Sequence, residues 1–171
     1  ISNCTFIGNY LGGNNNPPGG AIVSSVSDAG VSHCTFIGNR TIDRAGAIYF
    51  EAAYTSMVSY CTFVSNWTTR LDYYAGGAIY CQAGSIPTIR DCVFIDNWAT
   101  NGGSSGGGGI FSYNNARTVV ENCVFRGNRA KYGGGILLSP GLPVISNCTF
   151  YGNTSLVAGV GGIHLLQSCT A

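Results

Sequence analysis

Six copies of one short motif, Cys-x-Phe-x-x-Asn, constrain the fold of this chain more than any other feature. Their cysteines are spaced by 30, 27, 31, 31 and 25 residues. A glycine-rich motif that ends in isoleucine lies between successive copies, as in Gly76-Gly77-Ala78-Ile79. Self-similarity at such a period is typical of repeat architectures, in which each repeat is one structural unit.

Each repeat is too short to bury an apolar face alone, so neighbouring repeats must stack. Helical periodicity is absent, and β-branched and aromatic residues fill short runs between glycine and asparagine clusters. We therefore predict an all-β fold, a single β-solenoid domain over residues 1–171 with about six rungs of 25–31 residues.

The paired motifs resemble the repeats of the polymorphic outer membrane protein family and related surface proteins. The likeness covers nearly the whole chain. It implies a right-handed parallel β-helix and a role as a secreted or surface-displayed adhesin.

Side chains alternate along a strand, so the cysteine and phenylalanine of each motif share one face. We expect three inward columns and a column of asparagines at the bends, where stacked amides can hydrogen-bond from rung to rung. The phenylalanines and motif isoleucines are Phe6, Phe36, Phe63, Phe94, Phe125, Phe150, Ile22, Ile48, Ile79, Ile110, Ile136 and Ile163. The third column comprises Ile1, Val31, Val58, Ile89, Val120 and Ile145, and the asparagines run from Asn9 to Asn153.

One outward column predicts an exposed apolar stripe, which consists of Val23, Tyr49, Tyr80, Phe111, Leu137 and His164. Contiguous exposed apolar surface usually marks an interaction site. Tyr49, Tyr80 and Phe111 are therefore candidate contacts for glycans or for a laterally packed copy, together with Trp67 and Trp98, which we assign to loops. Loops that cover part of the stripe remain an alternative.

The two ends of the sequence fit one repeat register. The bend residue follows a motif isoleucine by 9 or 10 positions, and Ala171 lies eight positions after Ile163. Open solenoid ends template further pairing, and a non-closing contact of this kind builds a filament. We expect a head-to-tail interface formed by Ile1, Ser2, Asn3, Cys4, Phe6, Ile163, Leu165, Leu166, Cys169 and Ala171. A fragment of a longer solenoid is the alternative.

Composition limits the other functions. Only 9% of residues are charged and the net charge is +1, so we expect neither nucleic-acid binding nor membrane insertion. Eight cysteines in a low-charge chain favour an extracellular or cell-surface location. We expect mostly buried thiols in the cysteine column, with disulfides between rungs, such as Cys4–Cys34, as the alternative. No Cys-x-x-Cys pair or Cys/His cluster points to a metal, and no cofactor is expected.

Catalytic residues are not evident. The chain has only seven acidic residues, whereas glycosidases need paired carboxylates. Asp91 and Glu121 come closest, beside Arg90, and we interpret them as solvated charges. The sequence therefore predicts a non-enzymatic filament subunit, with a carbohydrate-binding adhesin segment as the alternative.

Overall fold

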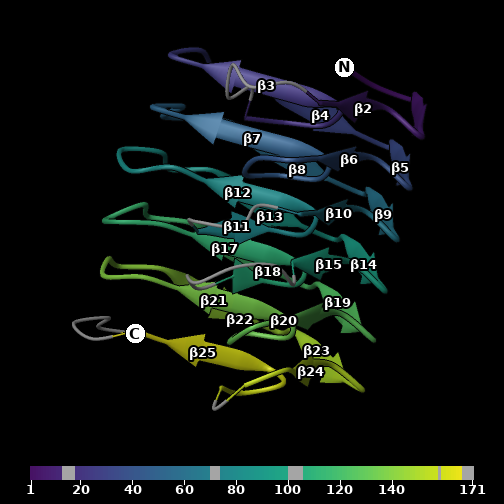
Figure 1. Ribbon diagram of the computed structural model, residues 1–171. Coiled ribbons are helices and arrows are strands. Elements are labelled where there is room, and N and C mark those ends of the chain that lie inside the picture. The colour runs from purple at the N-terminus through teal and green to yellow at the C-terminus, as the bar shows by residue number, and fades with distance from the viewer. Residues whose placement is uncertain (13–17, 70–73, 100–105, 158, 167–171) are drawn as a thin grey trace.

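A computed structural model describes residues 1–12, 18–69, 74–99, 106–157 and 159–166. The chain winds as a parallel β-solenoid of about five turns, and the described residues include no helix (Figure 1). Each turn passes through four sheets in the same order, which we name the Val, Phe, Trp and Ile sheets after a residue of their columns. All pairings are parallel and in register, as the repeat predicts.

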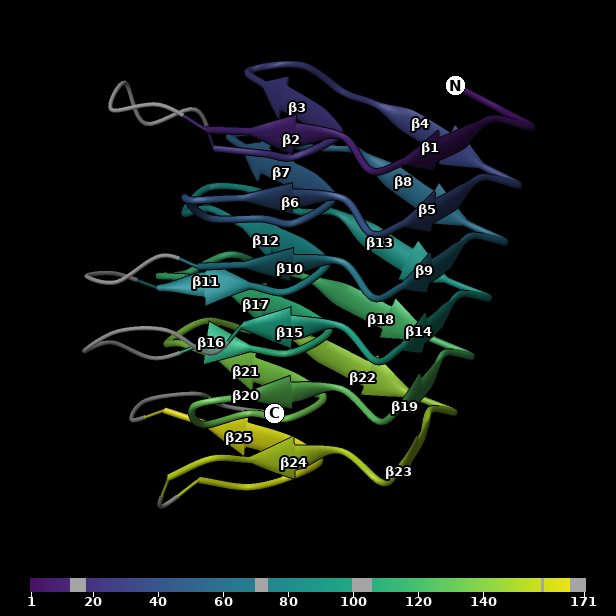
Figure 2. The ribbon, with the colours of Figure 1, turned by 45° about the vertical axis from the view of Figure 1, so that its right-hand side comes forward.

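The Val and Phe sheets adjoin at one corner of the solenoid (Figure 2). The Val sheet contains β4 (Gly30–Ser32), β8 (Met57–Ser59), β13 (Thr88–Arg90), β18 (Val119–Glu121) and β22 (Val144–Ser146). The Phe sheet contains β1 (Thr5–Ile7), β5 (Thr35–Ile37), β9 (Thr62–Val64), β14 (Val93–Ile95), β19 (Val124–Arg126) and β23 (Thr149–Tyr151). An isolated bridge between Ser2 and Ser32 extends the Val sheet by one rung.

The Trp and Ile sheets complete each turn. The Trp sheet contains β2 (Tyr10–Leu11), β6 (Arg40–Thr41), β10 (Trp67–Thr68), β15 (Trp98–Ala99), β20 (Arg129–Ala130) and β24 (Thr154–Ser155). The Ile sheet contains β3 (Ile22–Ser25), β7 (Ile48–Glu51), β12 (Ile79–Cys81), β17 (Ile110–Ser112), β21 (Ile136–Leu138) and β25 (Ile163–Leu165). A short pair, β11 (Ala75–Gly76) and β16 (Gly106–Gly107), lies between them.

The predicted inward columns form the core. Neighbouring phenylalanine rings of the Phe sheet are nearly parallel, with centroids 4.7 to 4.8 Å apart, the spacing of adjacent strands. Phe36, Phe63, Phe94 and Phe125 are fully buried, together with the isoleucines and valines of the interior rungs. Continuous columns of this kind bury apolar area at every stacking step, which is the main source of stability in a solenoid.

The asparagine column is a hydrogen-bonded ladder. In each interior rung the backbone N–H and Nδ2 of one asparagine both donate to Oδ1 of the asparagine one rung later, as from Asn39 to Asn66 at 3.0 and 2.9 Å. The same Nδ2 also donates to the carbonyl of Phe6, one rung earlier, at 2.9 Å. Every amide of the buried column is thus satisfied, which confirms the predicted role of these residues.

The glycine motif allows the rungs to approach closely beside the Ile sheet. A Cβ atom at Gly77 would overlap the carbonyl oxygen of Gly108 and the backbone nitrogen of Trp98. Gly46 and Gly108 are crowded in the same way by the next rung. The second glycine is therefore required by the backbone of the neighbouring turn, whatever the local torsion angle.

Seven of the eight cysteines are described, and all seven are free thiols. Each Sγ of the column lies 3.1 to 3.2 Å from the carbonyl oxygen two residues earlier, as Cys61 does from Ser59. Cys81 is fully buried in the Ile sheet, in register with Phe50 and Ser112. Buried thiols in the interior rungs agree with the favoured prediction.

Candidate functional site

The N-terminal face of the solenoid is formed by residues 1–3 and the outer edges of β1, β2 and β3. Ile1 is 58% exposed, and Ser2, Asn3 and Cys4 are exposed beside it. Phe6 is only partly buried, although its ring stacks on Phe36 at 4.8 Å. These five predicted interface residues therefore lie together on one end of the described fold.

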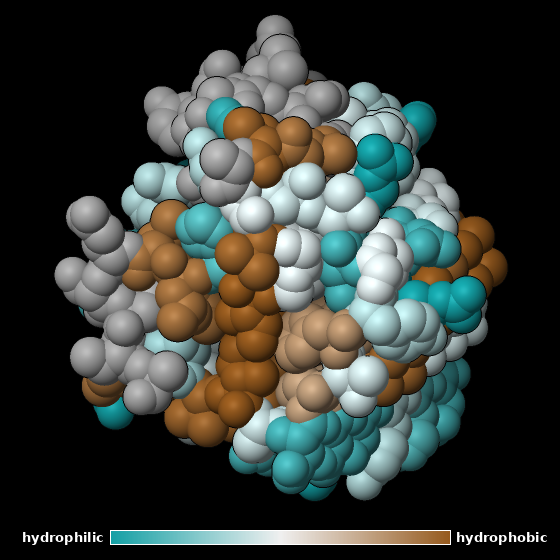
Figure 3. Space-filling model, turned by 90° about the horizontal axis from the view of Figure 1, so that it is seen from below, coloured by the Kyte–Doolittle hydropathy of each residue, from teal (hydrophilic) through white to brown (hydrophobic). Residues whose placement is uncertain are grey.

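The C-terminal face is formed by the outer edges of β22, β23, β24 and β25. Figure 3 looks onto this face and shows apolar side chains open to solvent near its centre. An apolar opening of about 430 Å³ lies there, lined by Leu138, Pro143, Val144, Ile145, Ile163 and Leu165. Ile163 and Leu165 thus reach the predicted face, whereas Cys169 and Ala171 lie outside the described residues.

The ends of the asparagine ladder differ in chemistry. At the C-terminal face the backbone N–H of Asn153 has no acceptor among the described residues, and its Nδ2 donates only to the carbonyl of Phe125 at 2.9 Å. At the N-terminal face Oδ1 of Asn9 receives no hydrogen bond from any described residue. One face therefore carries spare donors and the other a spare acceptor.

The prediction of an exposed apolar stripe is wrong for the four central residues of the column. Tyr49, Tyr80, Phe111 and Leu137 point away from the main core, as expected, but at most 3% of each is exposed. They form a second apolar cluster, against which Tyr74, Tyr113, Tyr132 and Leu166 pack. The chain folds over the outer face of the Ile sheet and covers it, so Tyr49, Tyr80 and Phe111 offer no open aromatic platform.

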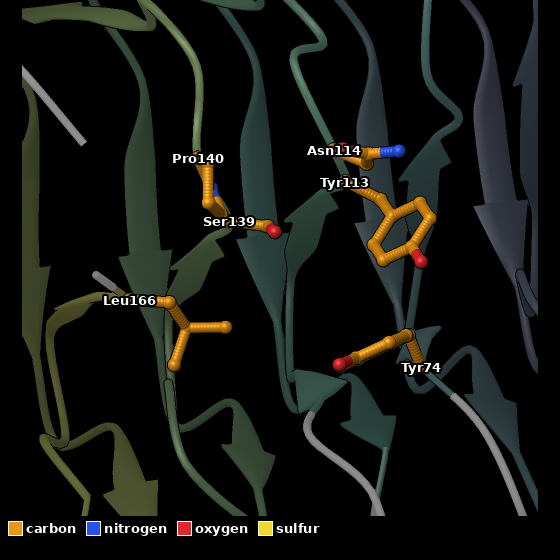
Figure 4. Close-up of a pocket in the computed structure, with 6 residues that line it drawn as sticks. All are labelled: Tyr74, Tyr113, Asn114, Ser139, Pro140 and Leu166. Atoms are coloured by element: carbon orange, nitrogen blue, oxygen red, sulfur yellow. The ribbon is translucent and has the colours of Figure 1, made fainter. Parts of the chain in front are cut away.

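A groove that the sequence did not predict runs over this second cluster. Three adjoining hollows of about 270, 200 and 460 Å³ share lining residues along the solenoid axis. Arg44 and Gln82 line the first two, and Tyr74 and Tyr113 line the last two. In Figure 4 Tyr74 and Tyr113 flank the largest hollow, with Leu166 across from them. Leu166 therefore belongs to this groove on the side of the solenoid.

Polar groups in the groove are held in place. Nη1 of Arg44 donates to Oε1 of Gln82 at 2.7 Å, and the guanidinium lies 5.7 Å from the ring centroid of Tyr80. Burial raises the pKa of the Tyr80 hydroxyl well above its usual range, and that of Tyr49 is raised by the same cause. Both phenols therefore stay neutral and can donate a hydrogen bond at physiological pH. The repeat carries no signal for the groove, because Tyr74 and Tyr113 lie outside the six-copy motifs.

Trp67 and Trp98 lie on strands β10 and β15, and not in loops as predicted. They are paired across neighbouring rungs of the Trp sheet, and 44% of Trp98 is exposed. Of the five predicted ligand contacts, these two tryptophans are the ones that reach the surface.

Charged groups do not converge elsewhere in the described part of the chain. Arg90 pairs in register with Glu121 and lies 3.9 Å from the carboxylate of Asp91, on the partly exposed edge of the Val sheet. The described residues hold no group of three or more histidine, cysteine or acidic side chains arranged to bind a metal. They also include no helix that could span a membrane.

Comparison with known proteins identifies the family. The family model described as "Right handed beta helix region" matches residues 1–153. Neither the curated proteins nor the solved structures yield a match. The match covers most of the chain, and its fold agrees with the parallel sheets described above. The chain therefore belongs to the right-handed β-helix family.

Proposed function

We propose that this protein is the structural subunit of an extracellular filament, in which copies stack head to tail through their N- and C-terminal faces. One observation carries the proposal: spare hydrogen-bond donors at Asn153 on one face match a spare acceptor at Asn9 on the other. A further solenoid rung placed on either face would continue the ladder in its existing direction.

The interior of the solenoid provides the geometry of such a joint. There each asparagine donates twice to the next one and once to the preceding phenylalanine carbonyl. Applied across the joint, the backbone N–H and Nδ2 of Asn153 donate to Oδ1 of the partner's Asn9. Nδ2 of the partner's Asn9 then donates to the carbonyl of Phe150. These bonds satisfy groups that are otherwise left to water.

Apolar columns continue through the same joint. The ring of the partner's Phe6 stacks on Phe150 as Phe150 itself stacks on Phe125, at 4.7 Å. The partner's Ile1 extends the column that ends at Ile145, which lines the apolar opening of the C-terminal face. A second copy suits this site because both faces carry the same residue types in the same columns.

The low charge of the chain and the likeness of its motifs to those of surface proteins support an extracellular filament. The chain carries few charges and a net charge of only +1, so it resists self-association weakly. Its paired motifs resemble repeats of the polymorphic outer membrane protein type, which belong to surface adhesins. We therefore place the filament outside the cell or at its surface.

Charged variants of the C-terminal face test the stacking. The double variant Val144→Lys and Leu165→Lys puts cations on residues that are 51% and 48% exposed, so the monomer keeps its fold. The matched control is Ile37→Lys, which is 37% exposed on the side of an interior rung. Light scattering of the 171-residue chain should show assemblies for the wild type and for the control, and monomers for the double variant.

Two results would contradict the filament proposal. If the double variant assembles like the control, the C-terminal face is not the joint. If the wild-type chain stays monomeric at high concentration, a second copy is not the occupant of this face.

Glycan binding is a second candidate function, and the groove over the Ile sheet is the observation that favours it. Tyr74, Tyr113, Gln82 and Arg44 combine partly exposed rings with hydrogen-bonding groups in a linear hollow, as carbohydrate sites do. The variant Tyr113→Ala should abolish binding on a glycan array, whereas Tyr151→Ala on the exposed Phe sheet should not. Unchanged binding in the first variant would exclude the groove.

A further inference from the structure

The outward column of the Trp sheet combines aromatic rings and guanidinium groups along the solenoid axis. In-register pairing places one side chain on each successive rung, in the order Tyr10, Arg40, Trp67, Trp98 and Arg129. We call these five residues the cation–aromatic strip. Tyr10, Arg40, Trp98 and Arg129 are exposed and Trp67 is partly exposed.

Stacking holds the guanidinium groups in position. Cζ of Arg40 lies 4.2 Å from the ring centroid of Tyr10 and 5.4 Å from that of Trp67. Cζ of Arg129 lies 5.9 Å from the ring of Trp98. An arginine that packs on a ring face loses side-chain freedom without using its N–H groups, so its planar fork remains available for a carboxylate or similar anion.

Most polar groups of the cation–aromatic strip are hydrogen-bond donors that make no hydrogen bond within the described residues. The side-chain N–H groups of Arg40, Arg129, Trp67 and Trp98 have no acceptor among the described residues, and neither arginine forms an ion pair there. Arginine and tryptophan side chains donate and cannot accept. The nearest described acidic residue along the chain is the exposed Asp96, at the corner before Trp98. The strip therefore complements a ligand that is rich in acceptors.

Charge spacing distinguishes between anionic polymers. Rungs are about 4.8 Å apart, so Arg40 and Arg129, three rungs apart, are separated by roughly 14 Å. A nucleic acid carries a phosphate about every 3.4 Å along each strand and is bound by strongly basic surfaces. This chain has a net charge of +1 and a pI of about 7.7. Two guanidinium groups with two tryptophans between them suit a polymer whose anionic groups are joined through sugar rings, so that two of its carboxylates reach the arginines while the sugars between them contact the indoles.

We propose that the cation–aromatic strip binds a linear carboxylated polysaccharide that lies along the solenoid axis. Arg40 and Arg129 pair with carboxylates of separate sugar units, and Trp67 and Trp98 contact the sugars between them through ring edges and indole N–H groups. The four contacting residues lie on β6, β10, β15 and β20, which are interior strands of the Trp sheet, on the side of the solenoid and outside the groove over the Ile sheet. Occupation of this site is thus independent of end-to-end stacking.

The experiment measures binding of polygalacturonate to the 171-residue chain, with fully methyl-esterified polygalacturonate as the uncharged counterpart. The double variant Arg40→Gln and Arg129→Gln should weaken binding of polygalacturonate about tenfold or more, because charge-assisted bonds to both forks are lost. Arg117→Gln is the matched control, since Arg117 is exposed and lies outside the strip. It should weaken binding by less than about twofold.

Each remaining outcome counts against the proposal. An equal loss in the control and the double variant would mean attraction to net charge alone. Equal binding of the methyl ester would exclude carboxylate recognition, and a preference for single-stranded oligothymidine would assign the strip to nucleic acid. Loss of polygalacturonate binding in Tyr113→Ala would move the site to the groove. Light scattering of the Arg40→Gln and Arg129→Gln double variant is the control for assembly. Because these residues lie on interior strands, the variant should assemble like the wild type, so a loss of binding does not reflect a loss of stacking.

Discussion

Asn66 donates both its backbone N–H and its Nδ2 group to the Oδ1 atom of Asn97, at 2.9 and 3.0 Å. Asn97 repeats the arrangement with Asn128, and all three residues are fully buried. A shorter or apolar side chain at this bend has no group that can replace both the acceptor and the donor. The relationship explains why every copy of the motif ends in asparagine.

Truncation of one ladder residue should destabilise the whole solenoid. Asn97→Ala leaves the backbone N–H and one Nδ2 proton of Asn66 without an acceptor. It also removes the Nδ2 donor from the carbonyl of Phe63 and from Oδ1 of Asn128, which keeps only the backbone N–H of residue 97. We expect the free energy of unfolding to fall by about 3 kcal/mol or more in urea denaturation. Asn9→Ala, at the exposed end of the ladder, should cost less than about 1.5 kcal/mol. Equal costs would contradict a cooperative ladder.

A methyl group at the second glycine should be tolerated poorly. Gly77→Ala forces a Cβ against the carbonyl of Gly108, and backbone on both sides leaves it no room to move. Thermal denaturation should show a loss of about 3 kcal/mol or more. Gly30→Ala is the control, because a Cβ there would meet open space. Normal stability of the Gly77 variant would show that the rungs separate more easily than the contacts imply.

A corner of the Phe sheet offers a stabilising change. Gly8, Gly38, Gly127 and Gly152 occupy this corner with φ near +60°, and Ser65 adopts the same conformation with φ of 52°. A left-handed backbone costs a non-glycine residue about 1 kcal/mol, so Ser65→Gly should raise the free energy of unfolding by up to that amount. The control Ser146→Gly, on strand β22, should be neutral or destabilising. A loss of stability in Ser65→Gly would contradict the view that the left-handed backbone of Ser65 is strained.

Alkaline pH should weaken the fold through Cys81. Burial raises the pKa of this thiol from 9.0 to about 12. The folded state holds the proton more tightly than the unfolded chain, so stability is unaffected below pH 9 and falls between pH 9 and about 12. The slope from one such group is about 1.4 kcal/mol per pH unit. Cys81→Val should reduce the slope of unfolding free energy against pH by this amount, and an unchanged slope in this variant would contradict the role of Cys81.

Features that repeat in the sequence were predictable. The phenylalanine, isoleucine, cysteine and asparagine columns recur at fixed offsets, and a one-residue shift in register would move the whole core face to solvent. Register, strand direction and core composition therefore follow from the motifs alone. The left-handed corner also had a sequence signal, since four of its six residues are glycine.

Features built from the variable segments were not predictable. Tyr74 and Tyr113, which lie outside the six-copy motifs, pack on Phe111, and Tyr113 also packs on Tyr80. Tyr49 in turn stacks on Tyr80, and all three inner rings are buried. The segments between the Trp and Ile sheets range from five residues (131–135) to ten (69–78) and differ in sequence, so no repeated pattern predicts which residues they cover. The sequence places Trp67 and Trp98 in loops because the strands of the Trp sheet are only two residues long, too short for an alternating pattern.

Electron microscopy of the purified 171-residue chain tests the central proposal most directly. The Phe, Trp and Ile sheets have six strands each, so head-to-tail stacking at about 4.8 Å per strand predicts unbranched fibres with an axial rise of roughly 29 Å per subunit. Fibres with that rise would support head-to-tail continuation of the asparagine and phenylalanine columns through each joint. Discrete monomers at high concentration, or fibres with an unrelated rise, would contradict stacking of the N-terminal face on the C-terminal face.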